Sequence, residues 1–144
     1  MAADTYELER FVRAQEAGGT YEAALAELRR GRKTGHWMWF VFPQIAGLGL
    51  SEMSRRYAIS SADEARAYLA HPILGPRLEA CARALLELED ATATEILGPV
   101  DSMKLRSSMT LFARAAPENA LFRGVLARYF AGRADEATDA RLAD

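Results

Sequence analysis

Residues 61–88 read SADEARAYLAHPILGPRLEACARALLEL, and the spacing of their apolar side chains decides the fold class. Apolar residues recur three and four positions apart, which is the spacing that gives a helix one buried face. Ser61 and Glu64 match a capping box, so one helix is predicted to begin here and to end before His71. The longest helix of the chain is predicted to begin at Pro76, because proline suits the first turn of a helix.

The same periodicity continues on both sides of this stretch, whereas the alternation typical of strands is nearly absent. Glycines, prolines and capping residues divide the rest of the chain into short helical segments. These are Asp4 to Gly18, Thr20 to Gly31, Ser51 to Tyr57, Thr92 to Gly98, Asp101 to Pro117, Phe122 to Gly132 and Asp135 to Leu142. The expected N-caps are Asp4 (paired with Glu7), Thr20, Thr92 (paired with Glu95) and Asp101. Residues 1–144 are therefore predicted to form a single compact all-α domain of about seven or eight short helices.

Composition narrows the function classes. The chain has 144 residues, half of them apolar and 26% charged, which suits one globular domain and excludes disorder. Cys81 is the single cysteine, so no disulfide can form within the chain. The net charge of -2 provides no overall positive field, so bulk nucleic-acid binding is not expected. The start, MAADTYELERF, has no signal-peptide pattern, and no apolar run approaches the ~20 residues that span a bilayer. We therefore expect a cytoplasmic protein with no membrane partner.

One segment lacks the alternation of apolar and polar faces that is typical of a surface helix. Residues 35–50 read GHWMWFVFPQIAGLGL and lack a polar face, so the segment must be buried or bind something. Pro43 biases Phe42 away from helical geometry, while Gly47 and Gly49 permit backbone conformations that other residues resist. The segment is predicted to be a packed aromatic loop with one helical turn. A short buried strand is the alternative, because so short an apolar run cannot be assigned from its period.

The overlapping stretch KTGHWMWFVFPQ, Lys33 to Gln44, gathers the side chains most suited to a ligand pocket. Lys33, Trp37, Trp39 and Gln44 are candidate ligand-binding residues, because indole faces stack on planar heterocycles and attract cations. His36 is a candidate catalytic residue, since an unperturbed imidazole titrates near neutrality. The alternative is that the indoles fill the core of the domain and that His36 is a structural histidine.

A second candidate set lies in DSMKLRSSMTLF, Asp101 to Phe112. Lys104, Ser107 and Ser108 would place a cation and two hydroxyls near the start of a helix, where an anion can be held, unless the serines serve close helix packing. The chain has 16 arginines but only two lysines, so Lys33 and Lys104 are candidate positions for a compact ammonium group. Metal ligands with a usual spacing are absent, and no hydrolase or dinucleotide motif occurs, so no metal or cofactor is expected.

The chain resembles the bacterial domain-of-unknown-function family numbered 1810. The resemblance is carried by LERFVRAQ, GRKTGHWMWFVFPQIAGLGLS, YAIS, EARAYLAHPILGPRL, EILGPVDSMKLRSSMTLF and GRADEAT. It implies a small all-helical protein and no particular reaction, because the family's activity is not established. Some relatives carry a calpastatin-like label, but such inhibitors are disordered repeat proteins, and this chain has neither property.

The stretch ERFVRAQ, residues 9–15, is similar to part of the NADAR proteins, which are linked to ADP-ribose and N-glycosidic chemistry. The similarity implies a carboxylate, Glu9, and an amide, Gln15, beside a sugar-phosphate pocket, with Glu9 as a candidate catalytic residue. Six positions on a helix correspond to a net rotation of roughly 240°, so these two side chains do not share a narrow face.

Two functional hypotheses follow from the sequence. The first is a pocket for a small anionic or nucleotide-like ligand, lined by tryptophan, histidine and lysine, with N-glycosidase or ADP-ribose chemistry as its catalytic form. The second is a non-catalytic interaction or structural module whose aromatic block is core. The position of the lysines and indoles relative to a solvent-accessible hollow distinguishes the two. The sequence leaves the oligomeric state open.

Overall fold

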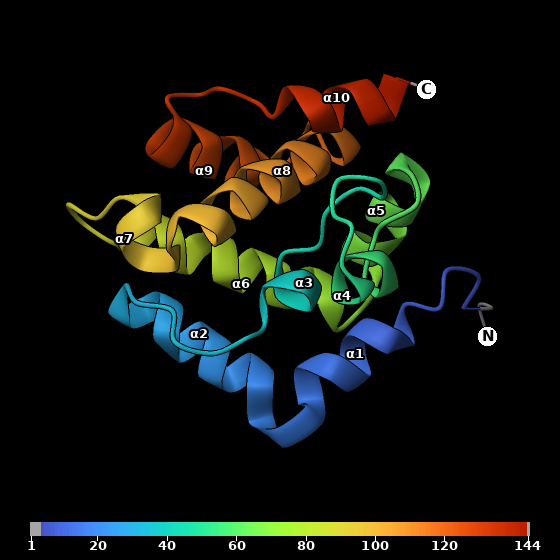
Figure 1. Cartoon of the computed structure of the whole chain (residues 1–144), viewed down its shortest axis with the longest axis horizontal. Helices are drawn as coiled ribbons and strands as arrows, with labels where there is room; N and C mark the ends of the chain where they lie inside the picture. The colour runs from blue at the N-terminus through green and yellow to red at the C-terminus, as the bar shows by residue number, and fades with distance from the viewer. Residues whose placement is uncertain (1–3, 144) are drawn as a thin grey trace.

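The chain is all-helical in the computed structural model, which describes residues 4–143. Helices α1 and α2 form one side of the molecule, α8, α9 and α10 form the opposite side, and α6 runs between them (Figure 1). No helix in the described range is both long and apolar enough to cross a bilayer. The bounds are α1 Glu9–Glu16, α2 Thr20–Arg30, α3 Met38–Val41, α4 Glu52–Arg56, α5 Ala62–Ala70, α6 Leu74–Glu87, α7 Ala93–Leu97, α8 Pro99–Ala115, α9 Ala120–Phe130 and α10 Glu136–Ala143.

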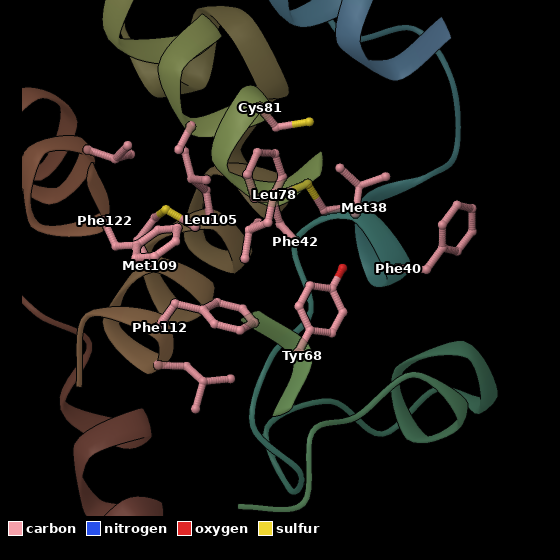
Figure 2. Packing of buried hydrophobic residues seen from close by; sticks show 14 of the residues in the cluster. Met38, Phe40, Phe42, Tyr68, Leu78, Cys81, Leu105, Met109, Phe112 and Phe122 are labelled. Atoms are coloured by element: carbon pink, nitrogen blue, oxygen red, sulfur yellow. The ribbon is translucent and has the colours of Figure 1, made fainter. Parts of the chain in front are cut away.

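The aromatic segment is a packed loop that contains one helical turn, α3, as predicted. The strand alternative is wrong for the described residues, whose only extended pairing is a single parallel bridge between Ile45 and Ile59. Phe42 follows α3 and is fully buried, and Figure 2 shows its ring among side chains from α6 and α8. The loop therefore crosses the centre of the domain.

Aromatic rings link the helices around this centre. The ring of Phe11 in α1 packs edge-on against Tyr68 in α5, with 5.1 Å between centroids. Tyr68 continues to Phe112 in α8 at 5.4 Å, and Phe112 continues to Phe122 in α9 at 5.8 Å (Figure 2). Such pairs contribute about 0.5–1.5 kcal/mol each beyond their buried area. These contacts join the two sides of the molecule into one core.

The starts of α6 and α8 differ from the prediction. The longest helix is α8 with 17 residues, whereas α6 has 14 and begins at Leu74, two residues before Pro76. Asp101 is the third residue of α8 and not its cap. The helix begins earlier because Pro99 occupies its first position, where the fixed φ of proline suits a helix. This shift leaves the Asp101 carboxylate free to form ion pairs.

The predicted caps have mixed outcomes. Thr92 forms the expected capping box, and the Ser61 hydroxyl accepts a hydrogen bond from the Glu64 amide. Thr20 is not a cap, since Gly19 precedes α2 in a left-handed conformation. Asp4 accepts hydrogen bonds from the amides at positions 8 and 9 rather than forming a box with Glu7.

Helix α10 has two turns rather than the single small turn expected, and it packs on α8. Arg114 of α8 forms an ion pair with Asp139 of α10, with 2.9 Å between Nε and Oδ1. Arg141 of α10 reaches the carbonyl oxygen of Gly47 in the loop after α3. Gly47 has a φ of +97°, a backbone conformation that strains residues with a Cβ, so the turn that meets Arg141 favours glycine.

Candidate functional site

The only two lysines of the chain meet at one carboxylate. Lys33 Nζ lies 2.8 Å from Asp101 Oδ2, and Lys104 Nζ lies 3.3 Å from Asp101 Oδ1. Lys33 is placed by its backbone amide, which donates to the Ile96 carbonyl at 2.7 Å, and its ammonium also donates to the Gly35 carbonyl at 2.6 Å. Two cations share one anion, so this ion cluster carries a net charge of about +1 at neutral pH.

Trp37, predicted as a ligand-binding residue, lies in the hydrophobic core. Its side chain is 1% exposed, and its indole N–H donates to Glu27 Oε1 at 2.9 Å. The same oxygen accepts hydrogen bonds from the amides of Thr34 and Gly35. Burial opposes ionisation of Glu27, but the amides of Gly35 and Thr34 and the Trp37 indole outweigh it and lower the pKa of the carboxyl to about 2. Glu27 therefore holds the loop before α3 as an anion.

Sequence reasoning did not identify Glu27 as a functional or structural residue. A signal was present, because position 27 lies three residues after Ala24 and directly before Leu28, on the apolar side of α2. A buried carboxylate on an apolar face requires hydrogen-bond donors, and the N–H groups after α2 provide them.

Trp39 occupies a different environment. It is only partly buried, and Lys104 Nζ lies 5.0 Å from its ring centroid. Lys33 Nζ lies 5.1 Å from the ring centroid of Trp37. Each indole thus has a lysine ammonium over a ring, within the range of a cation–π contact.

An open hollow of about 340 Å³ lies beside this ion cluster, between α8, the loop after α3 and the start of α10. Three predicted ligand-binding residues line it: Gln44, Lys104 and Ser107. Its walls are largely apolar, and the volume lies in the range of small-molecule sites. The complete lining consists of Gln44, Leu48, Gly49, Ser54, Val100, Met103, Lys104, Ser107, Asp135 and Ala137.

Asp135 is the lining residue that sequence reasoning missed as a site candidate. Its Oδ2 accepts hydrogen bonds from Ser107 Oγ at 3.0 Å and from both the amide and the hydroxyl of Thr138. The Asp135 amide donates to Thr110 Oγ1 at 2.8 Å. Asp135 therefore fixes the start of α10 against α8 and adds a carboxylate to the wall of the hollow. The sequence gives no local signal for this, because α8 and α10 meet only in the folded chain.

The remaining candidates do not join the hollow. Ser108 is fully buried, and its hydroxyl has no hydrogen-bond partner among residues 4–143. His36 is exposed before α3. Glu9 lines a separate hollow with His71, whose Nδ1 accepts hydrogen bonds from two backbone amides at the start of α6. Neither candidate catalytic side chain, Glu9 or His36, therefore lines the hollow beside Lys104.

Gln15 is a buried structural amide. Its Nε2 donates to the Phe40 carbonyl at 2.8 Å and to the Tyr68 hydroxyl at 3.2 Å, while its Oε1 accepts from Arg77. Burial raises the pKa of the Tyr68 phenol, so it remains protonated. Glu9 is exposed at the other end of α1, so it shares no cavity wall with Gln15.

The single thiol of the chain, Cys81, is buried. Burial raises the pKa of the Cys81 thiol to about 12, which keeps it protonated at neutral pH. Within residues 4–143, no cluster of three or more histidine, cysteine, aspartate or glutamate side chains could hold a metal ion.

Comparison with known proteins places the chain in a family. A solved structure described as the conserved hypothetical protein Rv1873 from Mycobacterium tuberculosis is 51% identical to it. The superposition has a TM-score of 0.95 and covers 98% of this chain and 99% of the other. No curated protein matches. The family model described as a protein of unknown function (DUF1810) matches residues 5–142, and the chain therefore belongs to this family.

Proposed function

We propose that the protein binds a small organic anion with an apolar body in the hollow beside Lys104. The observation that carries the proposal is the ion cluster, in which Lys33 and Lys104 share the single carboxylate of Asp101. One positive charge is left without an anionic partner in the cluster. A ligand carboxylate at the wall of the hollow would provide that partner.

Lys104 is the lysine suited to hold the ligand. The side chain of Lys33 is 10% exposed and is occupied by Asp101 and the Gly35 carbonyl, at 2.8 Å and 2.6 Å. The side chain of Lys104 is 21% exposed, has the longer contact to Asp101 and lines the hollow. Lys33 therefore fixes Asp101, and Lys104 retains capacity for a ligand.

The walls favour an aliphatic ligand over a nucleotide. Val100 and Met103 line the hollow and are 67% and 69% exposed, so a ligand that covered them would remove apolar surface from water. Trp37 is sealed in the core, and the ring of Trp39 already has the Lys104 ammonium over it. Neither indole lines the hollow, so a base bound there would have no indole face to stack on. With Glu9 and His36 elsewhere, we propose binding without turnover.

The test uses 4-methylpentanoate, an aliphatic monoanion, with the neutral 4-methylpentanamide as the matched probe. We expect the acid to raise the unfolding temperature of the protein, by the equivalent of about 2.7 kcal/mol at 100 times its dissociation constant, and the amide to have little effect. Lys104→Met should abolish the shift. Arg83→Met, which removes an exposed charge on α6, should preserve it. The proposal fails if the acid gives no shift, or if Lys104→Met responds as the native chain does.

A further inference from the structure

We infer that the ligand of this hollow is a zwitterion with an apolar side chain, the chemical class of the free aliphatic α-amino acids. This inference rests on the proposed function, because it assigns the anionic group of the ligand to Lys104. It adds a second charged contact, to Asp135.

The two ionised side chains that line the hollow have opposite charges. Lys104 comes from α8, and Asp135 comes from the segment between α9 and α10. Ser107, which also lines the hollow, lies one turn after Lys104 and donates its hydroxyl to Asp135 Oδ2. The hollow thus has a cation and an anion on its walls with a hydroxyl between them.

Asp135 retains capacity for a ligand ammonium group. The three hydrogen bonds to its carboxylate from Ser107 and Thr138 all use Oδ2. Within residues 4–143, Oδ1 has no such partner, so one oxygen can accept from an ammonium donor. The structural contacts on Oδ2 would hold the carboxylate in place while Oδ1 binds the ligand.

Charge balance favours a zwitterion over a simple anion. A phosphate or other dianion beside Lys104 would also face the carboxylates of Asp101 and Asp135, which repel it. A monoanion would satisfy Lys104 and leave Asp135 without a counter-charge. A molecule with a carboxylate and an ammonium group matches both walls.

The apolar walls match an aliphatic side chain. Leu48 from the loop, Val100 and Met103 from α8, and Ala137 from α10 surround the polar groups. The volume of about 340 Å³ is near the lower end of ligand sites, which suits a single amino acid better than a large ligand. Leucine combines the two charges with an aliphatic body and is the probe we choose.

Isothermal titration calorimetry on the full chain tests the inference with three related molecules. Leucine carries both charges, 4-methylpentanoate lacks the ammonium group, and leucinamide lacks the carboxylate. We expect leucine to bind about fivefold more tightly than 4-methylpentanoate, the effect of one partly exposed ion pair, and leucinamide to bind most weakly. Asp135→Asn should remove the advantage of leucine and leave the affinity for 4-methylpentanoate unchanged.

The outcomes separate this inference from the proposed function. If 4-methylpentanoate binds as tightly as leucine to the native chain, the zwitterion is wrong and the anion site stands. If neither acid binds, both proposals fail. Asp139→Asn is the matched control for α10, because it breaks the ion pair with Arg114 at a residue outside the hollow. A loss of leucine preference in this control as well would assign the effect to the docking of α10 and overturn the role of Asp135.

Discussion

Trp37 and Trp39 are separated by one residue, yet they belong to different parts of the molecule. Trp37 is 1% exposed and donates its indole N–H to a buried carboxylate, Glu27. Trp39 is partly buried beside Lys104, at the ion cluster next to the hollow. The two indoles diverge because α3 begins between them, so the backbone turns after Trp37. A compact aromatic motif can therefore serve the core and the edge of a site at the same time.

The two environments also differ in how their charges are satisfied. Glu27 is one buried anion whose Oε1 accepts hydrogen bonds from three N–H donors. The Lys33, Asp101 and Lys104 cluster has two cations for one anion, which leaves it incomplete. Buried groups with hydrogen-bond partners stabilise a fold, whereas an unbalanced charge at an open hollow can be used for binding.

The largest expected effect is the loss of stability when Glu27 is removed from the core. Glu27→Ala would leave the buried Trp37 indole N–H and the part-buried amides of Thr34 and Gly35 without their acceptor. We expect the free energy of unfolding to fall by about 3–5 kcal/mol. Urea denaturation measures it. The matched change on the other side, Lys104→Met, should cost less than about 1 kcal/mol, and a reversed order would refute the division into core and site.

Acid should remove the contribution of ionised Glu27 to stability within a defined pH range. The pKa of Glu27 is lowered to about 2 from its usual value near 4.5, so its contribution to stability is present above pH 4.5 and is lost as the pH falls toward 2. The loss amounts to about 3 kcal/mol. Denaturation curves recorded between pH 6 and pH 2 would show it. In Glu27→Gln this part of the acid dependence should disappear, and its persistence would assign the effect to other carboxylates.

Replacing each indole by phenylalanine should separate the two environments by a smaller difference in stability. Trp37→Phe removes the hydrogen bond to Glu27 and leaves space in a sealed core, so we expect a loss of about 2–3 kcal/mol. Trp39→Phe keeps an aromatic face for Lys104 at a partly exposed position and should cost less than about 1 kcal/mol. Thermal unfolding of both variants provides the measurement. Equal losses would show that the indoles share one environment.

The smallest expected effect is that of nucleotides. AMP and ADP-ribose should produce no shift in unfolding temperature at concentrations where 4-methylpentanoate does, because Trp37 is inaccessible and Trp39 already interacts with Lys104. A clear shift with AMP that Trp39→Ala abolishes would restore the stacking hypothesis and count against an aliphatic ligand.

The helices were predictable because the local spacing of apolar residues shows which face of each helix is buried. The all-α class, the packed aromatic loop and the Thr92 capping box follow from contacts within a few residues. The start of α8 was misassigned because the sequence pair Gly98 and Pro99 matches both the end of one helix and the beginning of the next. Local signals of equal strength on both sides of a boundary leave its position to tertiary packing.

The candidate site was only partly predictable, because its parts meet through tertiary contacts. The rarity of lysine singled out Lys33 and Lys104, which are 71 positions apart in the sequence. No spacing rule brings them to the same carboxylate, since this depends on the packing of α7 and α8 against the loop after α2. Asp135 joins the hollow through α10, whose position on α8 is equally non-local.

The most direct test of the account is a crystal structure of the protein soaked with 4-methylpentanoate. The account predicts the ligand carboxylate within hydrogen-bond distance of Lys104 Nζ, with the aliphatic chain against Val100 and Met103. An empty hollow in crystals soaked at a concentration that saturates the protein in solution, or a ligand bound at another surface, would contradict it.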